Sequence, residues 1–173
     1  MDYKIMEEKL SNVKIIGGIG SILLFLLLVC SIWEKFWFIS IVALVLLLVA
    51  LNMMANILND KQIYKNFLIA FILKFVGVIA IITSSNLGYY IFFVMSVIGA
   101  YYFKKTMYFL SAYTEMILFK IGGLLCFIGA ILQIFYFFEF FKIATVVHSF
   151  NLIAWALIAI GFFTISKETI LKH

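Results

Sequence analysis

The sequence predicts an all-α, polytopic membrane protein: a compact bundle of six transmembrane helices that forms a single domain over residues 1–173. Composition is the first observation, because 66% of the residues are hydrophobic and 12% are charged, whereas a soluble domain carries about 25% charged residues. The second is a set of six apolar stretches, since a helix needs about 20 apolar residues to cross a bilayer. The third is that lysines occupy every second gap between these stretches.

Each apolar stretch predicts one span. We place the spans at roughly 13–33, 36–58, 66–83, 88–110, 117–138 and 144–165, with edges good to a few residues. The connection from Trp33 to Phe36 is very short, so the first two spans form a tight antiparallel hairpin. The third and fourth spans form another across residues 84–86.

The first stretch has a second interpretation, as a signal peptide, because residues 27–30 are faintly similar to a lipoprotein cleavage site. Val29 is larger than the small residue wanted before Cys30, and Glu7 and Glu8 precede the stretch. The stretch is also long enough to span. We therefore expect a retained helix.

The lysines give the orientation. One side of the predicted bundle holds ten of the thirteen basic residues: Lys4, Lys9, Lys14, Lys61, Lys65, Lys104, Lys105, Lys120, Lys167 and Lys172. The other side holds Lys35 and Lys142, and Lys74 lies within a span. Cytoplasmic connections carry the excess of positive charge, so we expect both termini in the cytoplasm of a multi-pass protein of the cell membrane. Lysines scattered in this way indicate topology and no nucleic-acid partner.

Small residues mark the helix faces that we expect to pack closely, since helices in lipid associate where backbones can approach. These residues are Gly17, Ser21, Gly77, Gly122, Cys126 and Ala130. The strings at 17–23 and 122–132 are similar in different registers, which indicates shared packing requirements more than a duplication. The chain has no proline, which favours continuous helices over the broken helices of many transporters.

The longest connection, residues 104–120, has apolar residues at helical spacing. This spacing predicts a helical extension or a short interfacial helix, and a plain connector is favoured over an element that binds a partner.

Lys74 is the candidate for an intramembrane polar site, because charges inside spans are costly and often functional. Ala70 and Gly77 share its helix face, so we expect it to be buried against the second span, where Asn52 and Asn56 accept its hydrogen bonds. The alternative is an ammonium that extends to the cytoplasmic interface, or a neutral structural amine. We favour the structural role, because no carboxylate within a span completes a relay.

Enzyme classes that need paired polar groups are disfavoured. The aspartates are Asp2 and Asp60, and the histidines are His148 and His173, all outside the centre of the spans. We expect no enzymatic activity, no catalytic residue, no metal and no cofactor.

One outer connection is surrounded by polar residues: Tyr136, Glu139, Lys142, His148 and Asn151. Solvated loop residues are commoner than a binding site at such a position. Gln133 suits a hydrogen bond between helices.

The strings at 17–23, 105–114 and 122–132, followed by residues 151–165, resemble an uncharacterised prokaryotic family of integral membrane proteins, the domain of unknown function 996. The resemblance covers most of the chain. It implies a multi-pass membrane domain and no catalytic residues.

Two functions remain as hypotheses. The first is a non-enzymatic structural or accessory protein that packs in the lipid bilayer with a membrane-protein partner or with itself. It is motivated by continuous helices, small-residue faces and the lack of catalytic groups. The alternative is a small transporter or channel that uses the bundle interior around Lys74.

Overall fold

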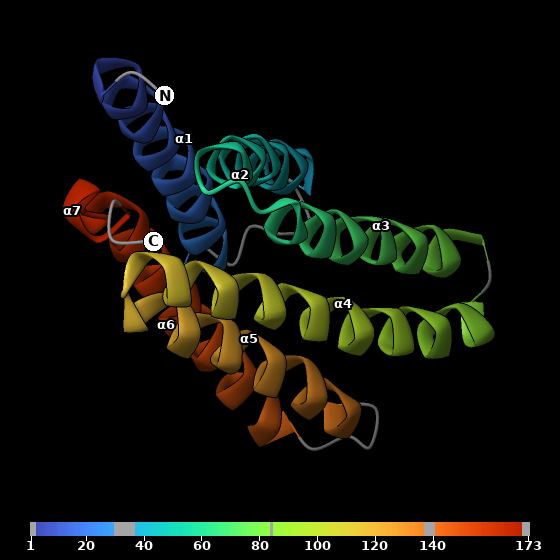
Figure 1. The fold of residues 1–173 in the computed structure, drawn as a ribbon. Helices are drawn as coiled ribbons and strands as arrows, with labels where there is room; N and C mark the ends of the chain where they lie inside the picture. The colour runs from blue at the N-terminus through green and yellow to red at the C-terminus, as the bar shows by residue number, and fades with distance from the viewer. Residues whose placement is uncertain (1–2, 30–36, 84, 137–140, 171–173) are drawn as a thin grey trace.

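The structure, a computed structural model, describes residues 3–29, 37–83, 85–136 and 141–170, and all secondary structure in these ranges is helical (Figure 1). Six long helices are followed by a single turn. Their bounds are α1 Tyr3–Val29, α2 Trp37–Ile57, α3 Lys61–Thr83, α4 Ser85–Thr114, α5 Ile117–Tyr136, α6 Phe141–Thr164 and α7 Lys167–Ile170. The predicted all-α class is confirmed.

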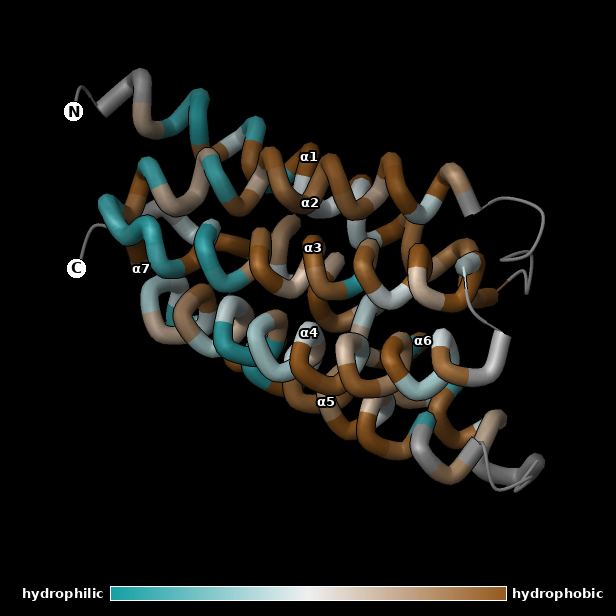
Figure 2. The backbone as a smooth tube through the Cα atoms, turned by 90° about the vertical axis from the view of Figure 1, so that its right-hand side faces the viewer, coloured by the Kyte–Doolittle hydropathy of each residue, from teal (hydrophilic) through white to brown (hydrophobic). Residues whose placement is uncertain are grey.

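Five helices in the described ranges contain segments long and apolar enough to cross a membrane. These are Met6–Val29, Phe38–Ile57, Lys61–Thr83, Leu87–Thr114 and Ala144–Thr164. In α5 the described apolar stretch is shorter, Ile117–Gln133. Figure 2 shows apolar backbone along most of the bundle and polar residues concentrated at one end. The helices therefore have the length and composition of a membrane protein.

The long helices form a closed ring. Each packs against its neighbours in sequence, and α1 closes the ring by packing against α6. Figure 1 shows α3 and α4 as an extended antiparallel pair, whereas α2 and α3 diverge from their shared turn. Accordingly, α3 and α4 share the most extensive contact and α2 and α3 the least extensive of these neighbours.

Both ends of the described chain lie at one end of the bundle, together with the α2–α3 and α4–α5 connections (Figure 2). This arrangement follows from antiparallel helices joined by short turns. Asn59 and Glu115 have positive φ angles of 53° and 55° in these two turns. At the first turn, the amide of Asp60 donates to the carbonyl of Ala55 at 3.0 Å, which ends α2 after a left-handed residue.

A side-chain hydrogen bond ties the same two turns together. The hydroxyl of Tyr113, near the end of α4, donates to Oδ2 of Asp60 at 3.0 Å. Oδ1 of Asp60 accepts the amide of Gln62 at 2.8 Å, at the start of α3. One carboxylate thus fixes the α2–α3 turn to α4.

Aromatic side chains fill the interior near the end that holds the termini. Ring centroids lie 6.0 Å apart for Phe67 and Phe103, and 5.1 Å apart for Phe119 and Phe162. Trp155 adds a contact with Phe103 at 5.4 Å. These rings come from α3, α4, α5 and α6, and dispersion contacts between them hold helices together where lipid supplies no hydrophobic driving force.

The helices extend past the predicted spans. α1 begins at Tyr3, ten residues before the predicted start, because a helix continues beyond the hydrocarbon that the apolar stretch reports. α4 continues to Thr114, so most of the predicted 104–120 connection is an extension of that helix. Residues 33–36 of the first predicted hairpin, and Ser84 of the second, lie outside the described residues.

Small residues occur where helices approach most closely. A Cβ atom on Gly17 would lie 2.5 Å from Cδ1 of Phe162, so α1 and α6 meet there. Gly77 faces α4, and its Cβ would lie 3.0 Å from Cδ2 of Phe92. Three more of the predicted packing residues, Ser21, Cys126 and Ala130, are buried, and the hydroxyl of Ser21 donates to the carbonyl of Gly17 at 2.8 Å.

Gly122 gives a stability prediction. Its Cβ would lie 2.6 Å from Cγ1 of Ile158 and 3.0 Å from the carbonyl oxygen of Ala154. We expect Gly122→Leu to push α6 away and to lower the free energy of unfolding by about 1–3 kcal/mol. Unfolding in detergent measures this loss. Ile121→Leu, at a neighbouring exposed position, is the control; equal stability of the two variants would contradict the close contact.

Candidate functional site

Lys74 lies on the side of α3 that faces the bundle interior. Ala70, one turn before it, is buried, and Phe67, two turns before it, contacts Phe103. Residues four and seven apart share a helix face, so Lys74 continues this interior stripe. Yet its side chain is exposed. The helices therefore do not close over Lys74 as they do over Phe67.

The structure corrects the expected contact between Lys74 and the second span. Lys74 lies 13 residues after the start of α3, whereas Asn52 lies 5 residues before the end of α2. At about 1.5 Å per residue these positions differ in depth by about 12 Å. The divergence of α2 from α3 widens the separation further (Figure 1). In addition, Lys74, Asn52 and Asn56 are exposed, and no hydrogen bond between them is found among the described residues.

Two polar groups on α4 and α5 lie nearer to Lys74. Gly99 packs on Ala70 and Gly77 packs on Phe92, so Lys74 and Ser96 lie between these contacts at one level of the α3–α4 pair. The ammonium of Lys74 is also within electrostatic range of Cys126 on α5. Sequence reasoning had assigned Cys126 to packing alone, and it had not identified Ser96.

Ser96 has an unusual environment. Its side chain is 8% exposed, and in the described part of the chain its Oγ is the one buried side-chain oxygen or nitrogen without a hydrogen-bond partner. It lies two turns from Phe103 on the same side of α4, which faces the interior. A buried hydroxyl without a partner costs about 1–3 kcal/mol. Ser96 is thus a free donor and acceptor beside Lys74.

This cluster of Lys74, Ser96 and Cys126 suits the binding of a small anion more than catalysis. An ammonium and a hydroxyl both donate hydrogen bonds, and the chain has no carboxylate near the middle of a span to neutralise the lysine. In the described residues, no group of three metal-ligating side chains exists.

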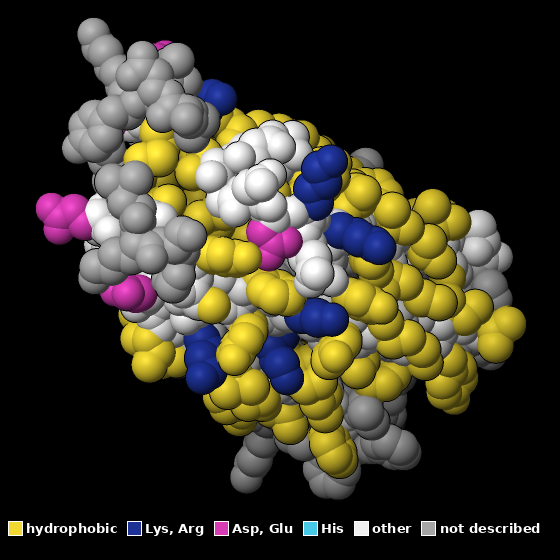
Figure 3. Space-filling view, in the orientation of Figure 1, with side chains coloured by type: hydrophobic (Ala, Val, Ile, Leu, Met, Phe, Trp, Pro, Cys, Tyr) yellow, Lys and Arg dark blue, Asp and Glu magenta, His cyan; other side chains and the backbone are white. Residues whose placement is uncertain are grey.

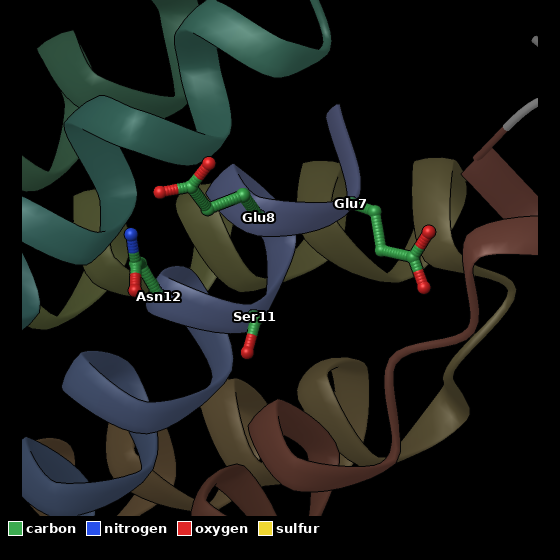
Figure 4. A pocket seen from close by; sticks show the side chains of 4 residues that line it. All are labelled: Glu7, Glu8, Ser11 and Asn12. Carbon is green, nitrogen blue, oxygen red and sulfur yellow. The ribbon is translucent and has the colours of Figure 1, made fainter. Parts of the chain in front are cut away.

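Two other depressions on the described surface offer fewer groups for binding or catalysis. One lies on the first turns of α1, lined by Glu7, Glu8, Ser11 and Asn12. Figure 4 shows the two carboxylates pointing to opposite sides of the helix, so they do not converge on one ligand. The second is an apolar depression between α1 and α6, lined by Phe25, Ser149, Leu152, Ile153, Ala156 and Leu157.

The polar residues around the outer connection do not form a described site. Asn151 packs against α5, because a Cβ on Gly129 would lie 3.3 Å from its side-chain oxygen. His148 and Gln133 are half-buried. Glu139 and the side chains of Tyr136 and Lys142 lie outside the described residues.

Comparison with known proteins identifies a relative but no activity. No family model matches the chain, so membership of the domain of unknown function 996 family stays a prediction. No solved structure matches it either. The chain is 30% identical over 151 residues to the uncharacterised protein MJ1644 of the archaeon Methanocaldococcus jannaschii, and the match covers 75% of this chain and 82% of the relative. The chain therefore belongs to the same family as this uncharacterised archaeal protein.

Proposed function

We propose that the protein is a non-enzymatic structural or accessory component of the cell membrane that associates through the outward face of α2, with a second copy or with another membrane protein. Val42, Val45 and Val49 lie on this face with exposed fractions of 50%, 42% and 41%. Asn52 and Asn56 continue the same stripe and are also exposed. These spacings of three and four residues align the five side chains along one side of the helix.

The main support for the proposal is the pair of exposed side-chain amides of Asn52 and Asn56. Neither amide has a hydrogen-bond partner among the described residues, and an unpaired amide that faces lipid is costly. Across helix contacts in membranes such a bond contributes about 0.6–2 kcal/mol. The valines above Asn52 are short and leave room for a second helix to approach. Because an amide both donates and accepts, this face is complementary to itself, which favours a symmetric pair.

The filled interior also supports a non-transporting role. Phe119, Phe162, Met107 and Leu110 are fully buried near the end that holds the termini. Side chains of this size occupy the space through which a continuous polar path would have to pass.

Cross-linking tests the association. In a background of Cys30→Ser and Cys126→Ser, we expect Val49→Cys to form a disulfide-linked dimer in membranes, because the two α2 faces meet there. Adding Asn52→Leu should weaken the association about 3- to 30-fold. Ile79→Cys, on the exposed face of α3, is the matched control.

Purification in mild detergent extends this test to other partners. A stoichiometric membrane protein that is retained by the parent and lost with Asn52→Leu would assign the face to a hetero-complex. If the chain remains monomeric, without a partner, and Val49→Cys cross-links no better than Ile79→Cys, the proposal is wrong.

We further propose that all six long helices cross the membrane and that both termini are cytoplasmic. The terminal end of the bundle carries the described lysines Lys9, Lys14, Lys61, Lys65, Lys104, Lys105 and Lys120. The excess of positive charge on cytoplasmic connections supports this orientation.

Cysteine labelling tests the orientation. In the same cysteine-free background, a membrane-impermeant maleimide should label Lys142→Cys on intact cells. It should label Lys172→Cys only after the cells are permeabilised. The opposite pattern would reverse the topology. Labelling of both sites on intact cells would require an even number of crossings between them or a leaky membrane, which a cytoplasmic marker protein detects.

A second candidate function, transport of a small anion, is supported by the position of Lys74 beside the free hydroxyl of Ser96. On the structural proposal, Lys74→Met keeps most of the volume without the charge, so folding and association should change little. Lys74→Glu should be less stable, because an anionic side chain has no nearby cation. Unfolding in detergent and chloride or acetate flux in proteoliposomes measure the two outcomes. A flux that Lys74→Met abolishes, with folding preserved, would favour transport.

A further inference from the structure

A basic patch covers the outer surface of three adjacent helices near the terminal end of the bundle. It consists of Lys61 and Lys65 on α3, Lys104 and Lys105 on α4, and Lys120 on α5. Figure 3 shows basic side chains gathered over the N-terminal part of α3 and the C-terminal part of α4. We call these five residues the lysine patch.

Contacts between the helices bring the patch to a common level. The hydroxyl of Thr106 on α4 lies 3.4 Å from the carbonyl oxygen of Ile63 on α3, so Lys65 and Lys105 lie at nearly the same level of this helix pair. On the other flank of α4, Gly123 of α5 packs against the backbone of Lys104. Lys120 therefore lies about one turn closer than Lys104 to the end of the bundle that holds the termini.

The lysines of the α4–α5 pair rest on aromatic rings. Nζ of Lys104 lies 4.6 Å from the ring centroid of Phe127 and 5.9 Å from that of Tyr101. Nζ of Lys120 lies 5.6 Å from the ring centroid of Tyr108. Such contacts hold the ammonium groups near the protein surface.

The lysine patch lacks internal counter-ions. Within the described residues none of its five side chains pairs with a carboxylate. Asp60 is close in sequence and accepts hydrogen bonds from Tyr113 and Gln62, but among the described residues it forms no ion pair with a lysine of the patch. The positive charge of the patch is therefore available to an external anion.

The position of the patch along the helices indicates which kind of external anion it meets. α4 has 30 residues, which at about 1.5 Å per residue is about 45 Å, longer than the hydrocarbon core of about 30 Å. Lys104 and Lys105 lie about 30 Å from the first residue of α4, which is one hydrocarbon thickness along the helix. Exposed Tyr101 and Leu124 lie below them on the hydrocarbon side.

We propose that the outer surface of the α4–α5 pair binds a phospholipid with a net negative headgroup. Lys104 and Lys120 contact the headgroup phosphate from the two helices, while Lys65 and Lys105 add positive charge from the α3 side. An acyl chain lies over Tyr101 and Leu124. Basic sites between helices at the cytoplasmic boundary are suited to anionic headgroups, and the aromatic rings keep Lys104 and Lys120 in place before the lipid arrives.

Native mass spectrometry of the full-length protein tests the proposal. The probes are dioleoyl phosphatidylglycerol, which is anionic, and dioleoyl phosphatidylcholine, which is zwitterionic. We expect the parent to prefer the anionic lipid and Lys104→Gln/Lys120→Gln to bind it about 30-fold more weakly, at one lysine's contribution for each substitution. Lys104→Arg/Lys120→Arg should retain most of the affinity.

The matched control is Lys9→Gln/Lys14→Gln on α1, which removes the same charge from the same end of the bundle on the opposite side of the ring. Equal loss in the two double variants would show a general charge effect and overturn the site. Equal affinity of the parent for both lipids would also overturn it. Displacement of the lipid by millimolar inorganic phosphate would assign the lysines to a soluble anion instead. Thermal unfolding of each variant verifies that the bundle is intact.

Discussion

Close approach of helices at glycine is the constraint on which the bundle depends. Lipid offers no hydrophobic gain for helix association, so packing contacts must supply the stability. Gly17 allows Phe162 to lie against α1, and Gly122 allows Ile158 to lie against α5. In both cases a large side chain of one helix occupies the place of a missing Cβ on the other. The ring closes because α1 and α5 offer this space to α6.

The same constraint divides the bundle along its length. Near the termini, rings from four helices meet and leave the interior filled. Further along α3 and α4, the interior stripe changes from Phe67 and Phe103 to Lys74 and Ser96. On α3 and on α4 alike, the large apolar side chain is replaced by a polar one two turns further from the termini. The aromatic half of the bundle therefore provides packing stability, and the polar side chains of these two faces lie in the other half.

Much of the fold could be predicted from the sequence, because apolar length and lysine spacing report directly on helices in a membrane. The side-by-side placement of Lys74 and the asparagines could not. That expectation assumed that consecutive helices remain in contact along their whole length, but α2 and α3 diverge after their turn. Depth along each helix and the crossing angle together decide which polar groups meet. Ser96 was missed because a single serine in an apolar helix carries no signal until its burial is known.

The polar groups in the membrane-spanning part differ in what could satisfy them. Thr83, Thr106, Thr114 and Ser149 donate to carbonyls of their own helices, so they need no partner. Asn52 and Asn56 have side-chain amides that both donate and accept hydrogen bonds. These amides lie on an outward face, where only another protein or the lipid headgroups can supply a hydrogen-bond partner. Lys74 faces inward with no carboxylate, and an unpaired ammonium in hydrocarbon costs at least about 2.5 kcal/mol. Because part of the Lys74 side chain is exposed, water or an anion that reaches its ammonium would lower that cost.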